Sequence, residues 1–557
     1  MTRLAPSEPF DVCVIGTGAG GGVMLDRLTA AGFRVVALER GPQLQTSQFD
    51  DDELANVVRD RVFSPEQIET YRLDANSPSE TGRFNQLAHC VGGTMTHWAA
   101  WSWRFREDEF RVLSSDGPLA GASLVDWPIS YADLEPFYEQ AESDFGVSGE
   151  AGSNPFESPR RKGYPNPAHP PRTSSEAFAA AARKLGHRPF PVPVAINSRP
   201  YAGRPRCFYG GACRSYGCAI HAKGTTFSIS IPRALATGKL DLRPNARVFE
   251  IPLGRDGRAN GARYLDAQGR EQEVRARQVV LAANAIGSPQ LLLLSKSGAF
   301  PHGLANSSGL VGANLTFHLH AGAIFLLDRP ARAYTGFEAQ TAIDDLHASD
   351  PKRGFIRGGV IAELNTINHQ PLGWAFNADG FPQLGRGWGA PLKRHLRGFP
   401  RSVVMASILE DLPVESNRVD LDPDVKDRLG LPVPRITHRQ HPNDLAMHRW
   451  YTQRILEIAE ASGAAERWPL GGPGLGVLDE KTAIKGNAHF HGTCRMGKDP
   501  ARSVVDANCR SHDVPNLWIV DSSVLPTSGG YNPTLTIVAN AYRVADHFAK
   551  QARRLSL

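Results

Sequence analysis

The chain has 557 residues, of which 41% are hydrophobic and 21% charged, and it carries a formal net charge of +5. This length exceeds what one hydrophobic core normally supports, so we expect roughly two to four domains. No block of Lys and Arg stands out, which argues against nucleic acid or an anionic membrane as a partner. The N-terminal stretch MTRLAPSEPF has no apolar signal segment, and no run approaches the ~18 apolar residues of a membrane span. We therefore expect no direct membrane span and a cytoplasmic protein, or a periplasmic one only if a signal-bearing partner subunit exports it.

Residues 10–42 have the order of a buried strand, a glycine turn, a helix, a second buried strand and an acid. The turn is Gly16-x-Gly18-x-x-Gly21, and the acid is Glu39. In such a unit the first glycine makes the tight turn, the second lets the backbone approach a pyrophosphate, and the third lets helix and strand pack closely. The helix N-terminus offers unpaired N–H groups to the phosphates, and the acid can accept from ribose hydroxyls. The segment predicts a dinucleotide site without separating FAD from NAD.

The next glycine-rich segment is residues 90–105, with the sequence CVGGTMTHWAAWSWRF. Gly92 and Gly93 permit a close backbone approach, and His97 and Trp98 follow among further tryptophans. After it, residues 151–206 are rich in proline, which at this density disfavours sheet pairing and helix interiors. We expect there an extended surface arm with one helix.

Three of the seven cysteines, Cys207, Cys213 and Cys218, lie close together directly after this arm. The low and odd cysteine count argues against a disulfide framework. Soft thiolate ligands suit iron, and three of them suit a three-iron iron–sulfur cluster. The alternative, which we prefer, is a set of reduced cysteines in a loop.

The strand pattern returns in residues 241–255, which contain Val248. Between about residues 325 and 480, strand-like segments alternate with turns and precede a helix, which suits a mostly antiparallel sheet with helices on one side. A strand ending in Asp521 and a helix from Pro533 onward then return to the dinucleotide domain. Three aromatic residues of the middle region are candidates for stacking on a sugar, with ordinary packing as the preferred alternative: Trp374, Phe376 and Trp388.

The motifs, taken together, resemble the glucose-methanol-choline (GMC) oxidoreductases, especially their pyranose oxidase-like members. The resemblance rests on the glycine turn, the 90–105 segment, the pattern Val311-Gly312-Ala-Asn314-Leu315, NAHFHGTCRMG at 487–497 and GGYNPTLT at 529–536, in this order. It covers residue 10 to about residue 548. It implies an α/β fold: a GMC-type FAD-binding Rossmann-like domain (1–324 and 481–557, with the arm 151–206) and an inserted, mostly antiparallel α+β substrate domain (325–480).

The resemblance also implies roles for single residues. His489 matches the family's base, three residues before a Gly-Thr pair, and this spacing favours it over His491. Asn532 matches the partner that orients the alcohol, although it could instead cap the following helix. His97 matches a flavin-facing histidine that is covalently bonded in some members and only packed beside the ring in others. The residues implied to bind FAD are Gly16, Gly18, Gly21, Glu39, Gly92, Gly93, His97, Trp98, Val248, Asp521, Asn532, Pro533 and Thr534.

The function implied is FAD-dependent oxidation of a secondary alcohol of a sugar or glycoside, at pyranose C2 or C3, to a ketone. Hydride passes to flavin N5, His489 takes the proton, and O2, a quinone or a cytochrome takes the electrons. An alternative is a gluconate- or glucose-type dehydrogenase large subunit, which oxidises a sugar acid or an anomeric hydroxyl with a 3Fe-4S cluster on Cys207, Cys213 and Cys218 and a small partner subunit. This chain departs from that cysteine spacing by one residue in the second gap. A non-redox lyase of the same fold is a further alternative.

Overall fold

A computed structural model describes residues 9–58, 67–364, 374, 388–464, 466–469 and 489–554. Its largest sheet runs β8-β2-β1-β11-β10-β9, and β19 pairs with β11. The strands are β1 (Phe10–Ile15), β2 (Val35–Leu38), β8 (Leu240–Arg243), β9 (Arg247–Glu250), β10 (Gly261–Leu265), β11 (Glu271–Leu281) and β19 (Leu517–Ile519). Strands β1, β2, β8, β11 and β19 are parallel, which is the arrangement expected of a dinucleotide-binding domain.

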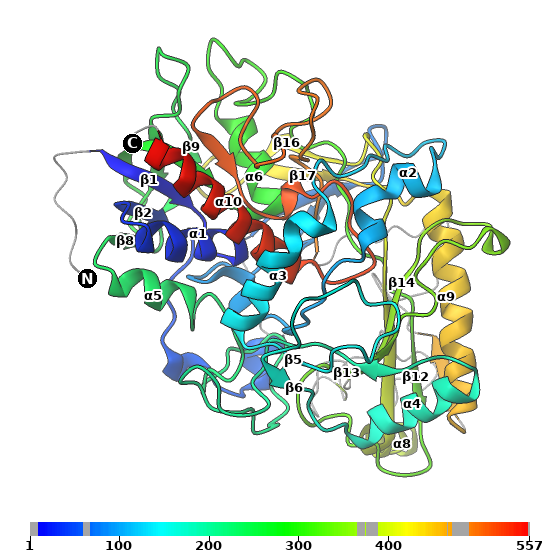
Figure 1. Cartoon of the computed structure of the whole chain (residues 1–557). Coiled ribbons are helices and arrows are strands. Elements are labelled where there is room, and N and C mark those ends of the chain that lie inside the picture. Colours follow the sequence, from blue (N-terminus) through cyan, green and yellow to red (C-terminus); the bar gives the residue numbers. More distant parts are fainter. Residues whose placement is uncertain are drawn as a thin grey trace.

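Helices pack around this sheet, beginning with the helix that follows the glycine turn. Helix α1 (Ala19–Ala30) begins directly after the turn and packs against α10 (Thr534–Arg554), as Figure 1 shows for the blue and red ribbons. Helix α3 (Tyr131–Phe145) also packs against α10, and Ser130 with Asp133 forms a capping box at its start. The remaining helices of this half are α2 (Val112–Asp116), α5 (Ser230–Ala236) and α6 (Asn284–Leu294).

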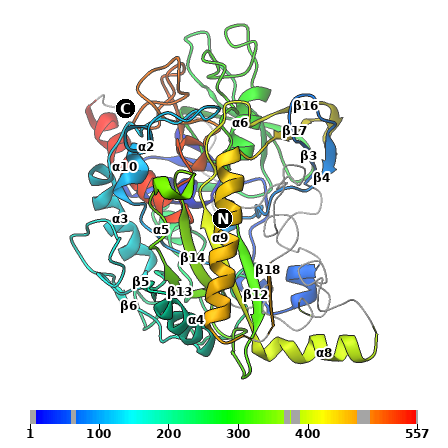
Figure 2. The same cartoon turned by 90° about the vertical axis from the view of Figure 1, so that its right-hand side faces the viewer.

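The other half is an antiparallel sheet in the order β18-β12-β15-β14-β13-β7. Its strands are β7 (Phe190–Pro191), β12 (Gly322–Leu326), β13 (Ala339–Ile343), β14 (Gly359–Leu364), β15 (Ser402–Leu409) and β18 (Glu466–Pro469). Helices α4 (Thr173–Lys184) and α9 (Pro442–Ala461) pack on it, and Figure 2 shows α9 running along the strands. The sheet supports the expected α/β architecture with an antiparallel second half.

Two strand-like segments of the middle region do not join that sheet, contrary to our expectation. Strands β16 (Arg418–Lys426) and β17 (Pro432–Thr437) form a separate sheet with β3 (Glu69–Arg72) and β4 (Glu80–Gly82). The polar, acidic stretch between Glu39 and residue 80 has no clear strand pattern in its sequence. It supplies β3, which pairs in parallel with β17.

The proline-rich arm is also more integrated than the prolines suggest. Val192, Val194 and Ile196 are buried in the main core, and β7 pairs with β13. The backbone of Val194 bridges to both Trp101 and Ser148, so isolated pairs replace the regular ladder that proline interrupts. A short strand pair, β5 (Ser148–Gly149) with β6 (Asn166–Pro167), completes this region. Among the helices of the described ranges, none is long and apolar enough to cross a membrane.

Candidate active site

The glycine turn is packed so tightly that two of its glycines exclude any side chain. A Cβ on Gly16 would lie 2.4 Å from the carbonyl oxygen of Ala282, and Gly16 has φ of +94°. A Cβ on Gly21 would lie 2.0 Å from the carbonyl oxygen of Gly16. These contacts give Gly16 the tight turn and Gly21 the close helix–strand packing that the sequence predicts.

Gly18 faces open space instead, and this space is bounded by the second glycine segment. A Cβ on Gly18 would meet nothing nearer than the Cα of Gly93, 3.9 Å away. The segments are tied together because the N–H of Gly92 donates to Thr17 Oγ1 at 3.0 Å. The start of α1 and the short 3₁₀ helix Gly93–Thr96 thus form a backbone-lined cradle, which fits the pyrophosphate of a dinucleotide.

Glu39 follows the end of β2, and its buried carboxylate holds the turn. It accepts from the Thr17 N–H at 3.0 Å, the Thr17 hydroxyl at 2.8 Å and the Gly41 N–H at 3.1 Å. Burial raises the pKa of this carboxyl. A carboxylate has about four lone-pair sites, so Glu39 can still accept a hydrogen bond from a ribose hydroxyl.

A hollow of about 450 Å³ lies beside the residues that follow β2. Its lining includes two arginines, Arg40 and Arg247, together with Asn284 and Gly287 at the start of α6. Val248, half-buried on β9, is the neighbour of Arg247. The hollow adjoins the Glu39 turn through Arg40, the residue after Glu39.

His97 ends the 3₁₀ segment with a buried ring, and its Nδ1 has no hydrogen-bond partner among the described residues. Burial, followed by the nearby Lys223 ammonium, lowers the pKa of His97 to about 3, so the imidazole is neutral. Lys223 itself donates to the carbonyl of Trp98 at 3.0 Å. A buried, neutral and unpaired imidazole is an unusual group that a bound flavin can contact.

The predicted catalytic pair is brought together. Asn532 Nδ2 donates to His489 Nε2 at 3.2 Å, and Asn532 Oδ1 accepts from Trp103 Nε1 at 3.0 Å. Helix α10 begins two residues after Asn532, whose amide is engaged by Trp103 and His489. His489 has φ of +69°, a left-handed conformation that is costly for a non-glycine residue and is often found at functional sites.

A third residue of this chain, His318, was missed by the sequence reasoning. His318 Nδ1 lies 3.0 Å from His489 Nδ1, and His318 Nε2 lies 2.5 Å from the carbonyl oxygen of Gly529. It lies three residues after the family-like pattern ending at Leu315, in the sequence HLH. No local motif marks this residue.

The partners decide which ring nitrogens carry protons. A carbonyl can only accept, so His318 Nε2 must be protonated and donate to Gly529. Burial lowers the pKa of His318 to about 4, so the ring is neutral and its Nδ1 is an acceptor. His489 therefore donates from Nδ1 to His318 and keeps its lone pair on Nε2, where the Asn532 amide donates to it.

Two other histidines flank the pair. Burial is the main reason why the pKa of His489 lies well below its ordinary value, and the nearby His318 and His320 rings lower this pKa further. His320 donates from Nδ1 to the carbonyl of Ser407 at 2.9 Å, and its ring centroid is 6.3 Å from that of His489. His491 is fully buried, and neither of its ring nitrogens has a partner among the described residues.

The loop before α10 is held by a buried ionic cluster. Tyr531 donates to Asp344 at 2.7 Å, and its ring stacks on His347 with centroids 4.6 Å apart. His347 contacts Glu109 and Asp344; burial alone would lower its pKa, but these two carboxylates raise it to about 9. The imidazolium and its partners fix Tyr531 and thus the adjacent Asn532.

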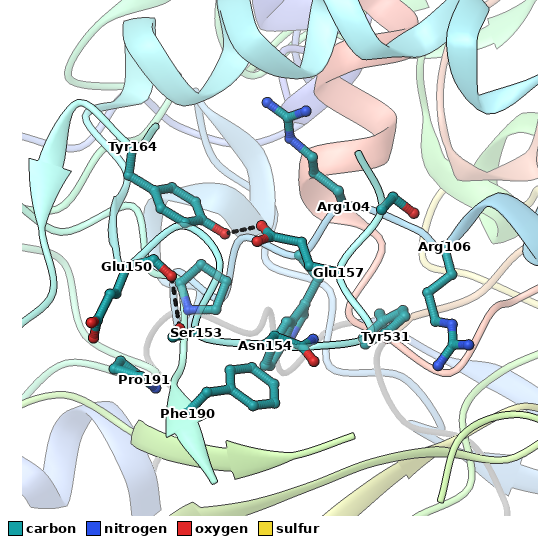
Figure 3. A pocket seen from close by; sticks show the side chains of 13 residues that line it. Arg104, Arg106, Glu150, Ser153, Asn154, Glu157, Tyr164, Phe190, Pro191 and Tyr531 are labelled. Atoms are coloured by element: carbon teal, nitrogen blue, oxygen red, sulfur yellow. Dashed lines mark hydrogen bonds between the residues drawn. The ribbon is translucent and has the colours of Figure 1, made fainter. Parts of the chain in front are cut away.

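A polar hollow of about 390 Å³ is lined in part by Trp103 and Tyr531 (Figure 3). Its walls include Arg106, Glu157 and Tyr164, with the Tyr164 hydroxyl donating to Glu157 at 2.9 Å. The hollow lies beside the two rings that support Asn532.

Asp521 lies at the end of β19, next to the start of α1. Its carboxylate accepts from the Asn284 N–H at 3.1 Å, the Ser288 hydroxyl at 2.5 Å and the Ser523 N–H at 2.8 Å. It links α6 to the C-terminal segment. Pro533 is buried and Thr534 half-buried at the start of α10.

The cysteine segment packs against the His97 loop, because the Ser215 N–H donates to the carbonyl of His97 at 2.9 Å. Cys207, Cys213 and Cys218 are all free. Burial raises the pKa of Cys213 to about 12. Within the described part of the chain, no group of three His, Cys, Asp or Glu side chains is arranged to hold a metal ion.

Of the three aromatic candidates for sugar stacking, the structure describes Trp374 and Trp388. Trp374 is buried against His395, with parallel rings 4.9 Å apart. Trp388 is 91% exposed. Phe376 lies outside the described residues.

Comparisons with known proteins identify the family. Family models described as GMC oxidoreductase match residues 127–320 and 413–541. The chain is 34% identical to 2-methyl-1,2-propanediol dehydrogenase of Mycolicibacterium austroafricanum (98% of this chain, 96% of that one). It is 33% identical to paromamine 6'-oxidase of Streptomyces fradiae (96% and 90%) and 30% identical to the gluconate 2-dehydrogenase flavoprotein of Pantoea cypripedii (98% and 94%). The fold resembles that of pyridoxine 4-oxidase from Mesorbium loti, with a TM-score of 0.65 and 19% identity over 98% of this chain and 99% of that one.

Fold, site and relatives together define an oxidoreductase that acts on CH–OH groups. The chain belongs to the GMC oxidoreductase family. FAD is the cofactor that this family implies, and the cradle between Gly18 and Gly93 fits its pyrophosphate.

Proposed function

We propose that the protein oxidises a secondary alcohol of a sugar or glycoside, at pyranose C2 or C3, to a ketone, with His489 as the base. The observation that carries this assignment is the hydrogen-bonded chain from Asn532 through His489 to His318. It leaves one basic nitrogen, His489 Nε2, beside one amide donor.

Removal of hydride from a carbinol carbon requires that the hydroxyl proton has an acceptor. In our proposal the substrate hydroxyl donates to His489 Nε2, and the Asn532 amide, released from that nitrogen, donates to the substrate oxygen. Asn532 can orient the alcohol but cannot take its proton, so acid–base work falls on His489. When bound, FAD accepts the hydride.

The surroundings favour His489 in this role before and after proton transfer. Its depressed pKa keeps the base unprotonated at neutral pH. After the transfer, the positive ring still donates from Nδ1 to His318, and the carbonyl of Gly529 accepts at the far end. Hydrogen bonds that involve a charged donor are about twice as strong as neutral ones.

The sugar assignment is supported by the relatives whose names state paromamine or gluconate as substrate. Another relative is named for a small diol, so small diols belong in the substrate panel. Oxidation of a sugar acid or an anomeric hydroxyl is the second candidate, favoured by the gluconate dehydrogenase likeness, with a small partner subunit. In our proposal O2, a quinone or a cytochrome takes the electrons.

The test is an anaerobic panel of sugars, glycosides, sugar acids and small diols, followed through the flavin absorbance. Bleaching by a pyranoside, with a ketone at C2 or C3 in the product, is the expected result. Bleaching only by gluconate-type acids or only by diols would overturn the sugar-ketone assignment, and no bleaching by any alcohol would favour a lyase. Repeating reduction with O2, a quinone and a cytochrome identifies the acceptor.

Two further experiments concern the cofactors. If His97 bonds covalently to FAD, the yellow colour stays with acid-precipitated protein and is released in His97→Ala; if the contact is non-covalent, the colour leaves the unmutated protein. A cluster on Cys207, Cys213 and Cys218 predicts iron and acid-labile sulfide in protein purified without oxygen. Their absence would leave FAD as the redox centre.

A further inference from the structure

Helix α8 (Ala390–Gly398) projects from the edge of the antiparallel half (Figure 2). One side of it is anchored: Trp374 Nε1 donates to the carbonyl of His395 at 2.9 Å, and His395 Nε2 donates to the carbonyl of Trp374 at 2.6 Å. Their rings are parallel, and Gly398 packs against the same tryptophan. The helix is therefore held at a defined orientation with its other sides outward.

The outward side is strongly basic. Lys393, Arg394 and Arg397 are exposed, and the helix APLKRHLRG contains no acid. None of the three cations forms an ion pair with another of the described residues. The composition of the whole chain hid this feature, because only the helix brings the three charges onto one projecting element.

Apolar side chains lie beside these cations. Trp388, directly before the helix, is 91% exposed, and Leu396 is 42% exposed. Within α8, Leu392 and Leu396 are four residues apart, the spacing of neighbours along one side of a helix, and Trp388 precedes the helix by two residues. Among large apolar side chains of the described residues, Trp388 is the most exposed.

We propose that α8 and Trp388 bind the surface of an anionic lipid bilayer. Lys and Arg beside Trp and Leu on a short projecting helix is the composition of elements that lie in the headgroup layer. The cations pair with lipid phosphates, while Trp388 and Leu396 enter the boundary of the acyl chains. Three cations near an anionic surface strengthen binding on the order of a hundredfold at low salt. This inference does not depend on the substrate proposed above.

The test is co-sedimentation of the holoenzyme with vesicles of phosphatidylcholine alone or with 30 mol% phosphatidylglycerol. We expect binding only to the anionic vesicles, weakening at high salt. The triple variant Lys393→Gln/Arg394→Gln/Arg397→Gln should lose binding on the order of a hundredfold. The variant Trp388→Ser/Leu396→Ser should lose about tenfold through lost apolar burial.

A matched control removes the same charge elsewhere: Lys239→Gln/Arg255→Gln/Lys296→Gln, three exposed residues of the other half. This control should bind like the wild type, and flavin content with thermal midpoint verifies that each variant is folded. Failure of the wild type to sediment with anionic vesicles would overturn the proposal and favour an acidic protein as partner. An equal loss of vesicle binding in the control variant would also overturn the proposal, because the net charge of the protein and not the position of the three cations would then explain binding. Unchanged binding of the Trp388/Leu396 variant would also refute insertion into the headgroup layer.

Discussion

Replacing His318 with Phe tests the proton arrangement of the site. The substitution keeps a ring in the cavity but removes the acceptor of the His489 Nδ1 proton, now 3.0 Å away. During alcohol oxidation His489 becomes charged, and a hydrogen bond from a charged group contributes about 1.5–3 kcal/mol. Loss of this contribution in the transition state slows the chemical step roughly 10- to 150-fold.

The assay is anaerobic stopped-flow reduction of the flavin by one good substrate across a range of pH. The variant should also show a lower apparent pKa for the base, because its protonated form has lost a partner. His318→Asn offers a side-chain oxygen as acceptor and should recover part of the rate. His491→Leu is the control: His491 is equally buried, its ring centroid is 5.3 Å from His318, and its nitrogens have no partner among the described residues. Wild-type reduction by His318→Phe, or equal losses in the Phe and Asn variants with an unshifted pH profile, would refute the reasoning.

Three further predictions concern the base, a buried ion pair and a buried imidazolium. His489→Ala should slow flavin reduction ~10²–10⁴-fold with FAD still bound, whereas Asn532→Ala should cost about 10–100-fold; an active His489→Ala would reject the assignment. Arg172→Met leaves buried Glu363 without its bidentate partner, two contacts of 3.0 Å, and should cost about 3–5 kcal/mol in unfolding free energy. Arg172→Met/Glu363→Leu should recover only part of it, because Arg172 also donates to the carbonyls of Thr335, Phe337 and Glu338. His347 has a folded pKa near 9, above its unfolded value, so its stabilisation is present below about pH 6.5 and is lost as pH rises through 9. The thermal midpoints of wild type and His347→Gln should therefore converge between pH 6 and pH 9, and a constant gap would contradict this.

The parts of the fold that could be predicted are those encoded locally. The order strand, glycine turn, helix, strand and acid lies within residues 10–42, and each step depends on neighbours in sequence. The capping box of Ser130 and Asp133 is local in the same way. Strand β3 is different: it is short, and it becomes a strand by pairing Thr70 with Arg435, far along the chain. No local pattern carries that information.

The site shows the same division. His489 and Asn532 lie in recognisable motifs, and the structure brings them together. His318 and Trp103, which orient them, became evident only when distant segments were placed side by side. The buried position of Trp374 likewise reflects packing against His395, which spacing in the sequence does not reveal.

The parallel sheet is completed late in synthesis. Strand β19 and helix α10 pair with β11 and α1 only after the whole antiparallel half has left the ribosome. Until then one edge of β11 has no neighbour and α1 lacks its packing partner, so the nascent chain exposes an unpaired strand edge and apolar surface to chaperones and proteases. Because His489 and Asn532 belong to this late segment, a ribosome that stalls before it leaves an incomplete sheet without the proposed catalytic pair. Completion of the parallel sheet and assembly of the proposed catalytic pair are thus the same late step.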